Sequence, residues 1–158
     1  MKIRTDLRIG DLSFLQQSHT EFYYREYQYT VPFEYYVGKA ISEFYESYTP
    51  ERSRIWIVEK AGRRVGSLVL QDRGTTAQLR FFLLLPEVQG KGIGGQLLQH
   101  FLDFCQEKEY ESAYFWTTDE QLAAGHLYRS VGFRVTEEKE SMNFGRKTLE
   151  QRYELRFA

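Results

Sequence analysis

The stretch of residues 79–100 constrains the fold most, because it combines three signals in a fixed order. Residues 79–85 form an apolar run that is too short for a core helix and is typical of a buried strand. Pro86 ends this strand, since proline cannot donate a hydrogen bond to a sheet. After a glycine-rich turn, apolar residues return at helical spacing, at Leu97, Leu98, Phe101, Leu102 and Cys105. The stretch therefore predicts a strand, a glycine turn and a helix.

The glycine turn, residues 89–95, has the properties of an anion-binding site. Its glycines stand at positions 90, 92, 94 and 95, and because they lack Cβ atoms an anion can approach the backbone closely. The first N–H groups of a helix have no partner within the helix, and the helix dipole adds about half a positive charge there. Each hydrogen bond to a charged group contributes about 1.5–3 kcal/mol, so about four or five of them would hold a pyrophosphate.

Two other interpretations of this turn stay open. Residues 90–95 also fit the pattern G-x-G-x-x-G, which in dinucleotide-binding proteins follows a strand directly and precedes an acidic residue by about 20 positions. Here Pro86 and further residues intervene, and although Glu111 stands near the acidic position, no second βαβ unit is visible downstream. The turn could also be purely structural, but four glycines in six positions are costly in conformational entropy.

Composition narrows the classes of function. A chain of 158 residues is one domain of ordinary size, residues 1–158. Its net charge of −1 and the lack of a basic run argue against nucleic acid as a partner. No apolar run is long enough to cross a membrane, and the first residues lack the apolar centre of a signal peptide, so we expect a cytoplasmic protein without a membrane partner. The single cysteine excludes an internal disulfide, and the three histidines show no metal-ligand spacing.

Hydrophobic periodicity predicts seven strands and four helices. The strands are expected at residues 2–9, 54–60, 65–71, 77–85, 112–118, 133–140 and 149–157. The helices are expected at residues 11–27 and 32–48, from the glycine turn to about residue 109, and before about residue 131. Asp11 is a candidate N-cap of the first helix, and Thr117-x-x-Glu120 and Thr118-x-x-Gln121 resemble capping boxes for the last. The order βααβββαβαββ predicts a mixed α/β sheet.

Two motifs are shared with a known family. Gln89, Gly92 and Gly94 fill the pattern Gln/Arg-x-x-Gly-x-Gly/Ala after a strand that ends just before a proline, and residues 127–133 fill a second pattern, aliphatic-Tyr followed by Gly-Phe. In these residues the sequence resembles the GNAT acetyltransferase family. The runs LRFFLLLP, HLYRSVGFRVTEEKES and EQRYEL extend the likeness to bacterial acetyltransferase modules found alone or fused to MarR-type regulators. The resemblance implies the GNAT fold, a mixed, mostly antiparallel seven-stranded sheet flanked by about four helices.

The resemblance also implies an activity and a co-substrate. GNAT proteins transfer an acetyl group from acetyl-CoA to a primary amine by direct attack, without a metal. The fourth strand would hold the pantetheine arm through its backbone, and the glycine turn would hold the pyrophosphate. Tyr128 occupies the position of the general acid, and a phenol with an ordinary pKa of about 10 can protonate a thiolate of similar basicity. The implied cofactor-binding residues are Phe82, Leu83, Leu84, Gln89, Gly90, Lys91, Gly92, Ile93, Gly94, Gly95, Gln121 and Tyr128.

The group that takes the proton of the amine departs from the family pattern. Peptide-acetylating relatives often carry a glutamate on the fifth strand, where this chain has Trp116, and an asparagine where it has Gln121. We expect Glu26 to be the base, and the alternatives are a water chain or one of His19, Glu34, Asp119 and Glu120.

The acceptor side is expected on the first two helices. Eight of the twelve tyrosines lie between Tyr23 and Tyr48, and five glutamates lie between Glu21 and Glu46. Such an aromatic and mildly acidic wall suits a cationic amine, either a small molecule or a peptide, although it could equally serve helix packing and a homodimer contact. The resemblance to the GNAT family therefore predicts an N-acetyltransferase. The alternative functions are a non-catalytic acyl-CoA-binding regulatory module and a nicotinamide enzyme.

Overall fold

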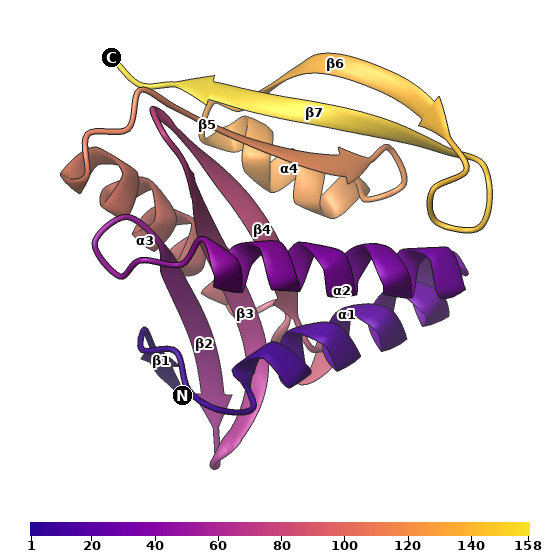
Figure 1. Cartoon of the computed structure of the whole chain (residues 1–158), viewed down its shortest axis with the longest axis horizontal. Coiled ribbons are helices and arrows are strands. Elements are labelled where there is room, and N and C mark those ends of the chain that lie inside the picture. Colours follow the sequence, from indigo (N-terminus) through magenta and orange to yellow (C-terminus); the bar gives the residue numbers. More distant parts are fainter.

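A single mixed sheet of seven strands organises the chain (Figure 1). The computed structural model describes residues 1–158, apart from the side chain of Ala123. The strands lie in the order β1-β2-β3-β4-β5-β7-β6, and β4 and β5 pair in parallel whereas the other neighbours are antiparallel. The predicted fold class and element order are confirmed. The strands are β1 (Lys2–Arg4), β2 (Arg54–Lys60), β3 (Arg63–Arg73), β4 (Thr76–Leu84), β5 (Ser112–Thr118), β6 (Arg134–Ser141) and β7 (Thr148–Arg156).

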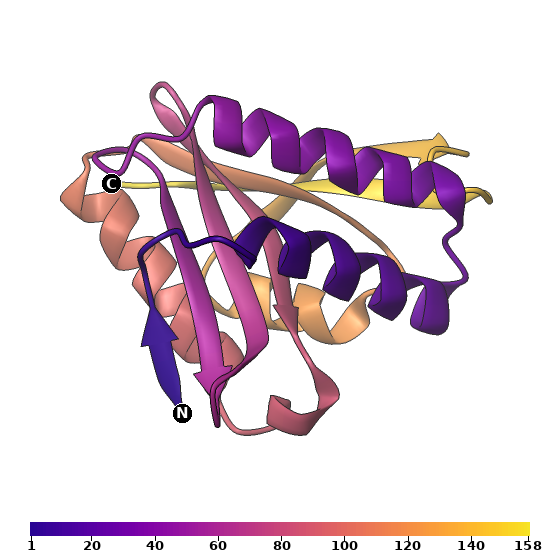
Figure 2. The ribbon, with the colours of Figure 1, turned by 60° about the horizontal axis from the view of Figure 1, so that its bottom comes forward.

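Helices cover both faces of this sheet. Figure 2 shows the pair α1 and α2 on one face and α3 and α4 on the other. The helices are α1 (Asp11–Tyr27), α2 (Val31–Glu46), α3 (Ile93–Glu107) and α4 (Leu122–Ser130), and a single 3-10 turn, η1 (Pro86–Val88), follows β4. In the part of the chain that the structure describes, no helix is long and apolar enough to cross a membrane.

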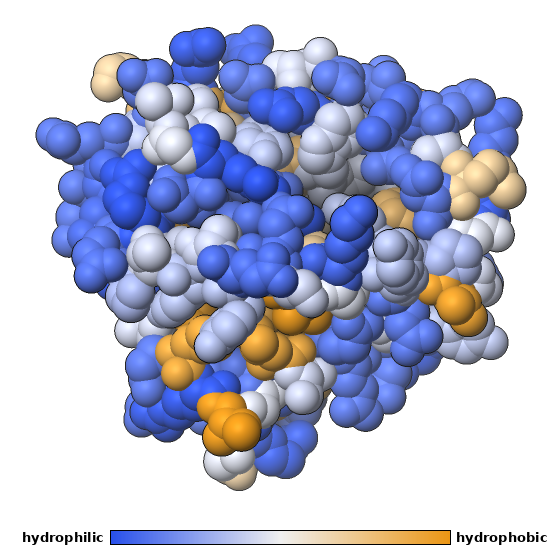
Figure 3. All heavy atoms as spheres, in the orientation of Figure 1, coloured by the Kyte–Doolittle hydropathy of each residue, from blue (hydrophilic) through white to orange (hydrophobic). Residues whose placement is uncertain are grey.

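The alternation of side chains along β2 divides the core between the two faces. Ile55 and Ile57 pack in one hydrophobic cluster with α1 and α2, whereas Trp56 and Val58 pack in the other cluster with α3. Because both faces of β2 are buried at its centre, residues 55–58 form a continuous apolar run. The remaining surface in the orientation of Figure 1 is mostly hydrophilic, with hydrophobic side chains gathered in the lower part of the view (Figure 3).

The parallel pair β4–β5 separates soon after it forms. Their register covers only Thr76–Gln78 against Ser112–Tyr114, while β4 stays paired with β3 as far as Leu84. A bulge lies in the separated part, because Ser67 pairs with Leu83 and Val69 pairs with Arg80. Phe81, within the bulge, has a left-handed φ of 52°, a conformation that is rare outside glycine and clusters near functional sites.

The start of the chain differs from the prediction. The first strand ends at Arg4 instead of continuing to residue 9, and Gly10 with a φ of 93° precedes α1, so Asp11 is not the N-cap. The Asp11 carboxylate is instead fully buried, where it accepts hydrogen bonds from Arg4 Nη2 and Arg64 Nε, both at 2.8 Å. Burial alone would raise the pKa of Asp11, but the hydrogen bonds from Arg4 and Arg64 lower it.

The predicted capping boxes before α4 are wrong. Gln121 precedes the helix, and no side-chain hydrogen bond caps it within the described structure. Thr118 and Glu120 are instead bound to Tyr29, whose hydroxyl lies 3.0 Å from Thr118 Oγ1 and donates to Glu120 Oε1 at 2.9 Å. A contact with a residue distant in the sequence therefore takes the side chains that local capping would use.

The hairpin β6–β7 closes over the connection between α1 and α2. The Thr30 N–H donates to the Phe144 carbonyl at 3.0 Å, and Arg146 Nε donates to the Tyr27 carbonyl at 2.8 Å. Gly145 permits this close approach, because its φ is 94° and a Cβ at this position would overlap Thr30 Oγ1. The hairpin tip is thereby held against the two N-terminal helices.

Candidate active site

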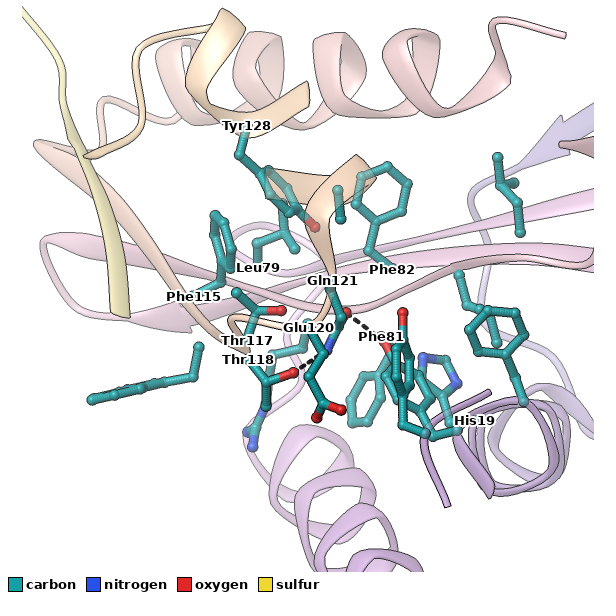
Figure 4. A pocket seen from close by; sticks show the side chains of 18 of the residues that line it. His19, Leu79, Phe81, Phe82, Phe115, Thr117, Thr118, Glu120, Gln121 and Tyr128 are labelled. Atoms are coloured by element: carbon teal, nitrogen blue, oxygen red, sulfur yellow. Dashed lines mark hydrogen bonds between the residues drawn. The ribbon is translucent and has the colours of Figure 1, made fainter. Parts of the chain in front are cut away.

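A cavity of about 760 Å³ lies where β4 and β5 separate. It runs from the glycine turn after β4, along the free edge of β4, to the side chains of α1, α2 and the β6–β7 hairpin. Figure 4 shows side chains from β4, β5 and both helix pairs that converge on it. This volume is typical of a small-molecule site.

The glycine turn forms one end of the cavity. Gly90 and Gly92 have φ angles of 75° and 78°, and no atom lies within 4 Å of a Cβ built at either position. No side chain caps the first turn of α3 in the described structure, so its N–H groups are free to meet an anion. Of the seven predicted residues, five line the cavity and two, Lys91 and Gly95, do not; the five are Gln89, Gly90, Gly92, Ile93 and Gly94.

The edge of β4 forms the middle of the cavity. The predicted residues Phe82, Leu83 and Leu84 all line it. The Leu85 N–H donates to the Val65 carbonyl at 2.9 Å, and because backbone groups alternate along a strand, the N–H of Leu84 points to the opposite side. That side is the one from which β5 has departed, so a backbone donor faces the cavity.

Tyr128 of α4 lies beside this edge. Its ring is buried against Phe115, with 3.9 Å between the ring centroids, and meets the ring of Phe82 at 6.0 Å. Figure 4 shows its hydroxyl directed into the cavity. Burial raises the pKa of Tyr128 well above its ordinary value, with smaller contributions from Tyr23 and Tyr153. The hydroxyl therefore keeps its proton throughout the neutral range.

Gln121 links the two sides of the cavity. Its Oε1 accepts a hydrogen bond from the Tyr23 hydroxyl at 3.2 Å, and its Nε2 donates to Thr118 Oγ1 at 3.3 Å (Figure 4). Gln121 also lines the cavity, as expected for a cofactor-binding residue.

The other end of the cavity is aromatic. Tyr29 and Phe33 lie 5.2 Å apart between ring centroids, and Phe144 of the β6–β7 hairpin lies 5.1 Å from Tyr29. Tyr27 and Tyr36 complete this wall. The expected aromatic wall on α1 and α2 is present, but the sequence contained no signal that Phe144 would join it.

The structure does not bring the expected base into the cavity. Glu26 is exposed on α1 and is not among the lining residues, and the alternatives Glu34 and Asp119 are exposed outside it as well. Two carboxylates do line the cavity, Glu120 and Glu150. Glu120 is paired with Arg146. Glu150 was not expected from the sequence, because neither a motif nor spacing marks it.

His19 lies in the wall of the cavity as a neutral side chain. Its Nδ1 lies 2.9 Å from the Leu15 carbonyl, so this nitrogen carries the proton and donates it. Its Nε2 is buried and has no hydrogen-bond partner among the described residues. Burial lowers the pKa of His19 to about 4, although the hydrogen bond to Leu15 opposes this change.

The described residues contain no group of three or more His, Cys, Asp or Glu side chains that could hold a metal ion. The site therefore consists of backbone donors, aromatic rings, a buried phenol and two carboxylates. Such a site can bind an anionic cofactor at one end and a cationic group at the other.

Comparison with known proteins identifies the family. A family model described as the acetyltransferase (GNAT) family matches residues 13–133. The chain is 32% identical over 93 residues to N-acetylaspartate synthetase of Danio rerio, covering 58% of this chain and 33% of that protein. It is 32% identical over 116 residues to N-acetyltransferase 8B of Homo sapiens, covering 66% of this chain and 51% of that protein. The chain thus spans between a third and about half of the length of these curated relatives.

Solved structures share the fold over nearly the whole chain. Ribosomal-protein-alanine N-acetyltransferase from Brucella melitensis superposes with a TM-score of 0.74 at 16% identity, covering 99% of this chain and 100% of that one. Spermidine N-acetyltransferase from Vibrio cholerae, in complex with CoA and spermine, superposes with a TM-score of 0.71 at 22% identity, covering 98% of this chain and 95% of that one. The finer likeness to modules fused to MarR-type regulators stays a prediction. The chain belongs to the GNAT acetyltransferase family.

Proposed function

We propose that this protein transfers an acetyl group from acetyl-CoA to a primary amine by direct attack. The observation that carries this proposal is the continuous cavity, which joins the glycine turn to the aromatic wall through the gap between β4 and β5. A GNAT-family acetyltransferase from Elizabethkingia anophelis with the same fold was solved with acetyl-CoA bound. The cytoplasmic location and the homodimer considered from the sequence stay predictions.

The anionic part of acetyl-CoA fits the glycine turn. Residues 89–95 would bind the pyrophosphate through the N–H groups at the start of α3, with Lys91 and Gly95 contributing from outside the cavity lining. The pantetheine amides would pair with the free edge of β4 at Phe82, Leu83 and Leu84. The Leu84 N–H is a donor on that edge, since its neighbour Leu85 is bound to Val65.

The buried phenol supplies the proton that the leaving group needs. As the amine lone pair bonds to the acetyl carbon, the C–S bond breaks and the thiolate takes the proton of the Tyr128 hydroxyl. Water in the cavity takes one proton from the ammonium group before the attack, which frees the lone pair. It takes a second proton from the acetylated nitrogen after the attack, and Tyr128 is reprotonated from this water. Glu26 is not assigned this role because it is exposed outside the cavity. His19, with a pKa of about 4, is too weak a base to hold the proton of an amine near pH 7.

The acceptor fits the aromatic end of the cavity. Rings of Tyr29, Phe33 and Phe144 face it together with two carboxylates, and such rings attract ammonium groups through their negative faces. A cationic amine, on a small molecule or a peptide, is therefore the proposed substrate.

Calorimetry with acetyl-CoA, combined with a thiol-release assay over a panel of amines, tests the function. Gly94 is a suitable position for a substitution that blocks the glycine turn. A Cβ there would meet the Leu127 and Leu84 side chains at an ordinary 3.7 Å, so the fold should tolerate it. Gly94→Val should weaken acetyl-CoA binding at least about tenfold by blocking backbone donors, whereas the exposed control Gln96→Val should not.

Tyr128→Phe should lower turnover by about 10²-fold or more with little change in acetyl-CoA affinity. Absence of acetyl-CoA binding by the wild type would refute the proposal as a whole. Binding without thiol release for any amine would favour the non-catalytic acyl-CoA-binding module instead.

A further inference from the structure

Glu150 of β7 is a buried carboxylate without a counter-charge in the described structure. Its side chain lines the cavity, and the residue is only 8% exposed. One hydrogen bond is formed, from Asn143 Nδ2 to Oε2 at 3.1 Å. Burial of a carboxylate costs free energy unless the group is paired or hydrogen-bonded. A cation that binds Glu150 from the cavity side would therefore gain a favourable interaction.

The cations around Glu150 are engaged elsewhere. On the same hairpin, Arg146 is paired with Glu120 and Lys147 with Glu140. Arg80, which lines the cavity from β4, is paired with Glu43 at 3.1 Å. Lys139 stands opposite Glu150 in the β6–β7 ladder, but its ammonium lies 4.7 Å from the centroid of the Trp116 ring instead. Glu150 thus forms no ion pair with a side chain of the described structure, and its only described hydrogen-bond donor is Asn143.

Aromatic rings stand beside this carboxylate. Glu150 pairs across the sheet with Thr118, and Thr118 Oγ1 lies 3.0 Å from the Tyr29 hydroxyl. Phe144, on the same hairpin as Glu150, packs against the Tyr29 ring at 5.1 Å. A carboxylate next to aromatic faces is the environment that binds an alkylammonium group.

This subsite is separated from the reacting atoms. Tyr128, the proposed acid, packs on Phe115, and Glu150 pairs with Thr118, three residues further along β5. Three strand residues span about 10 Å. We propose that Glu150 and the adjacent aromatic wall bind a second ammonium group of the acceptor. Since a charge-assisted hydrogen bond to the carboxylate spans about 2.8 Å of this distance, the preferred substrates are diamines with their nitrogens about 7–9 Å apart. This inference rests on the proposed acetyltransferase function.

Hexane-1,6-diamine and hexylamine are suitable probes, because they differ only in the second ammonium group. With wild-type protein and acetyl-CoA, the diamine should show a kcat/KM about 10- to 100-fold higher, as expected for a charge-assisted bond. Ethane-1,2-diamine is too short to reach Glu150 from the reaction site and should show no such advantage.

Glu150→Gln should reduce the ratio of the two kcat/KM values by about 10- to 100-fold, mainly through the KM of the diamine. Glu138→Gln is the matched control, since Glu138 is an exposed carboxylate on the same hairpin and should leave the ratio unchanged. Equal kcat/KM values for the two amines in the wild type, or an unchanged ratio in Glu150→Gln, would overturn the inference.

The outcomes separate this inference from the proposed function. If acetyl-CoA fails to bind or no amine is acetylated, the proposed function fails. The second-ammonium site is then decided by calorimetry of the wild-type protein with each amine, where equal affinities would refute it. This wild-type comparison also decides the question if Glu150→Gln does not fold.

Discussion

Acidification should destabilise the folded protein through His19. The side chain is held neutral, because Nδ1 donates to the Leu15 carbonyl at 2.9 Å and Nε2 is buried without a partner among the described residues. Its ring also stacks on Tyr23 and meets Phe81 edge-on at 5.5 Å, so an imidazolium has no room for water around it. Burial accordingly lowers the pKa of His19 from 6.5 to about 4.

The direction of this pH effect follows from the protonation of His19 in the folded and in the unfolded chain. Between pH 6.5 and about 4 the unfolded chain binds a proton at this histidine that the folded chain does not, so the free energy of unfolding falls as the pH falls through this window. At about 1.4 kcal/mol per pH unit, the loss is about 2 kcal/mol at pH 5 and about 3 kcal/mol below pH 4. Above pH 6.5 His19 is neutral in both states, so none of this free energy of unfolding is lost.

Urea unfolding of the wild type and of His19→Phe at pH 7.5 and pH 5 measures this effect. The wild type should lose about 2 kcal/mol more than the variant between the two values, because the variant has no group that titrates at position 19. His100→Gln, at an exposed position, should behave like the wild type. An identical pH dependence of wild type and His19→Phe would refute the reasoning. If His19→Phe does not fold, an NMR titration in which His19 becomes protonated above about pH 6 would refute it equally.

Two further predictions concern stability. Asp11→Asn should cost about 3–5 kcal/mol in urea unfolding, because the buried guanidinium of Arg4 loses its ion pair at 2.8 Å and keeps only the longer one to Glu59 at 3.5 Å. A loss below about 1 kcal/mol would show that the Arg4–Asp11 pair contributes no more than a surface ion pair. Gly145→Ala should destabilise the protein more than Gly74→Ala. Both glycines have a positive φ, but only at position 145 would the new Cβ overlap another residue, at Thr30 Oγ1. Equal losses of unfolding free energy would mean that the hairpin tip does not dock.

Local signals predicted the strand, turn and helix at which we propose that the cofactor binds. Pro86, the glycines of residues 89–95 and the apolar helix after them act within a few residues of each other, so their pattern specified strand, turn and helix. The alternation of Ile55, Trp56, Ile57 and Val58 similarly reported which residues face each helix pair. Such features depend on neighbours in the sequence, and the structure agrees with them.

The aromatic end of the cavity, where we propose that the acceptor binds, depends on contacts between residues that are distant in the sequence. Tyr29 takes Thr118 and Glu120 away from helix capping, and Asp11 binds arginines on β1 and β3 instead of capping α1. Each of these side chains can satisfy either a local or a distant partner, and burial decides in favour of the distant one because an unpaired buried group costs more than an uncapped helix end in water.

The same reasoning explains why Glu150 could not be recognised in the sequence. No motif or unusual spacing marks its strand. Its place in the cavity depends on the pairing of β7 with β5 and on the hairpin tip, which Phe144 and Arg146 hold on the α1–α2 connection. If that docking were lost, the aromatic wall would lose Phe144 and Glu150 would face water. The specificity for the second ammonium group should therefore depend on Gly145 as well, although this residue does not line the cavity. Gly145→Ala should lower the preference for hexane-1,6-diamine over hexylamine, and an unchanged preference would show that the hairpin does not position Glu150.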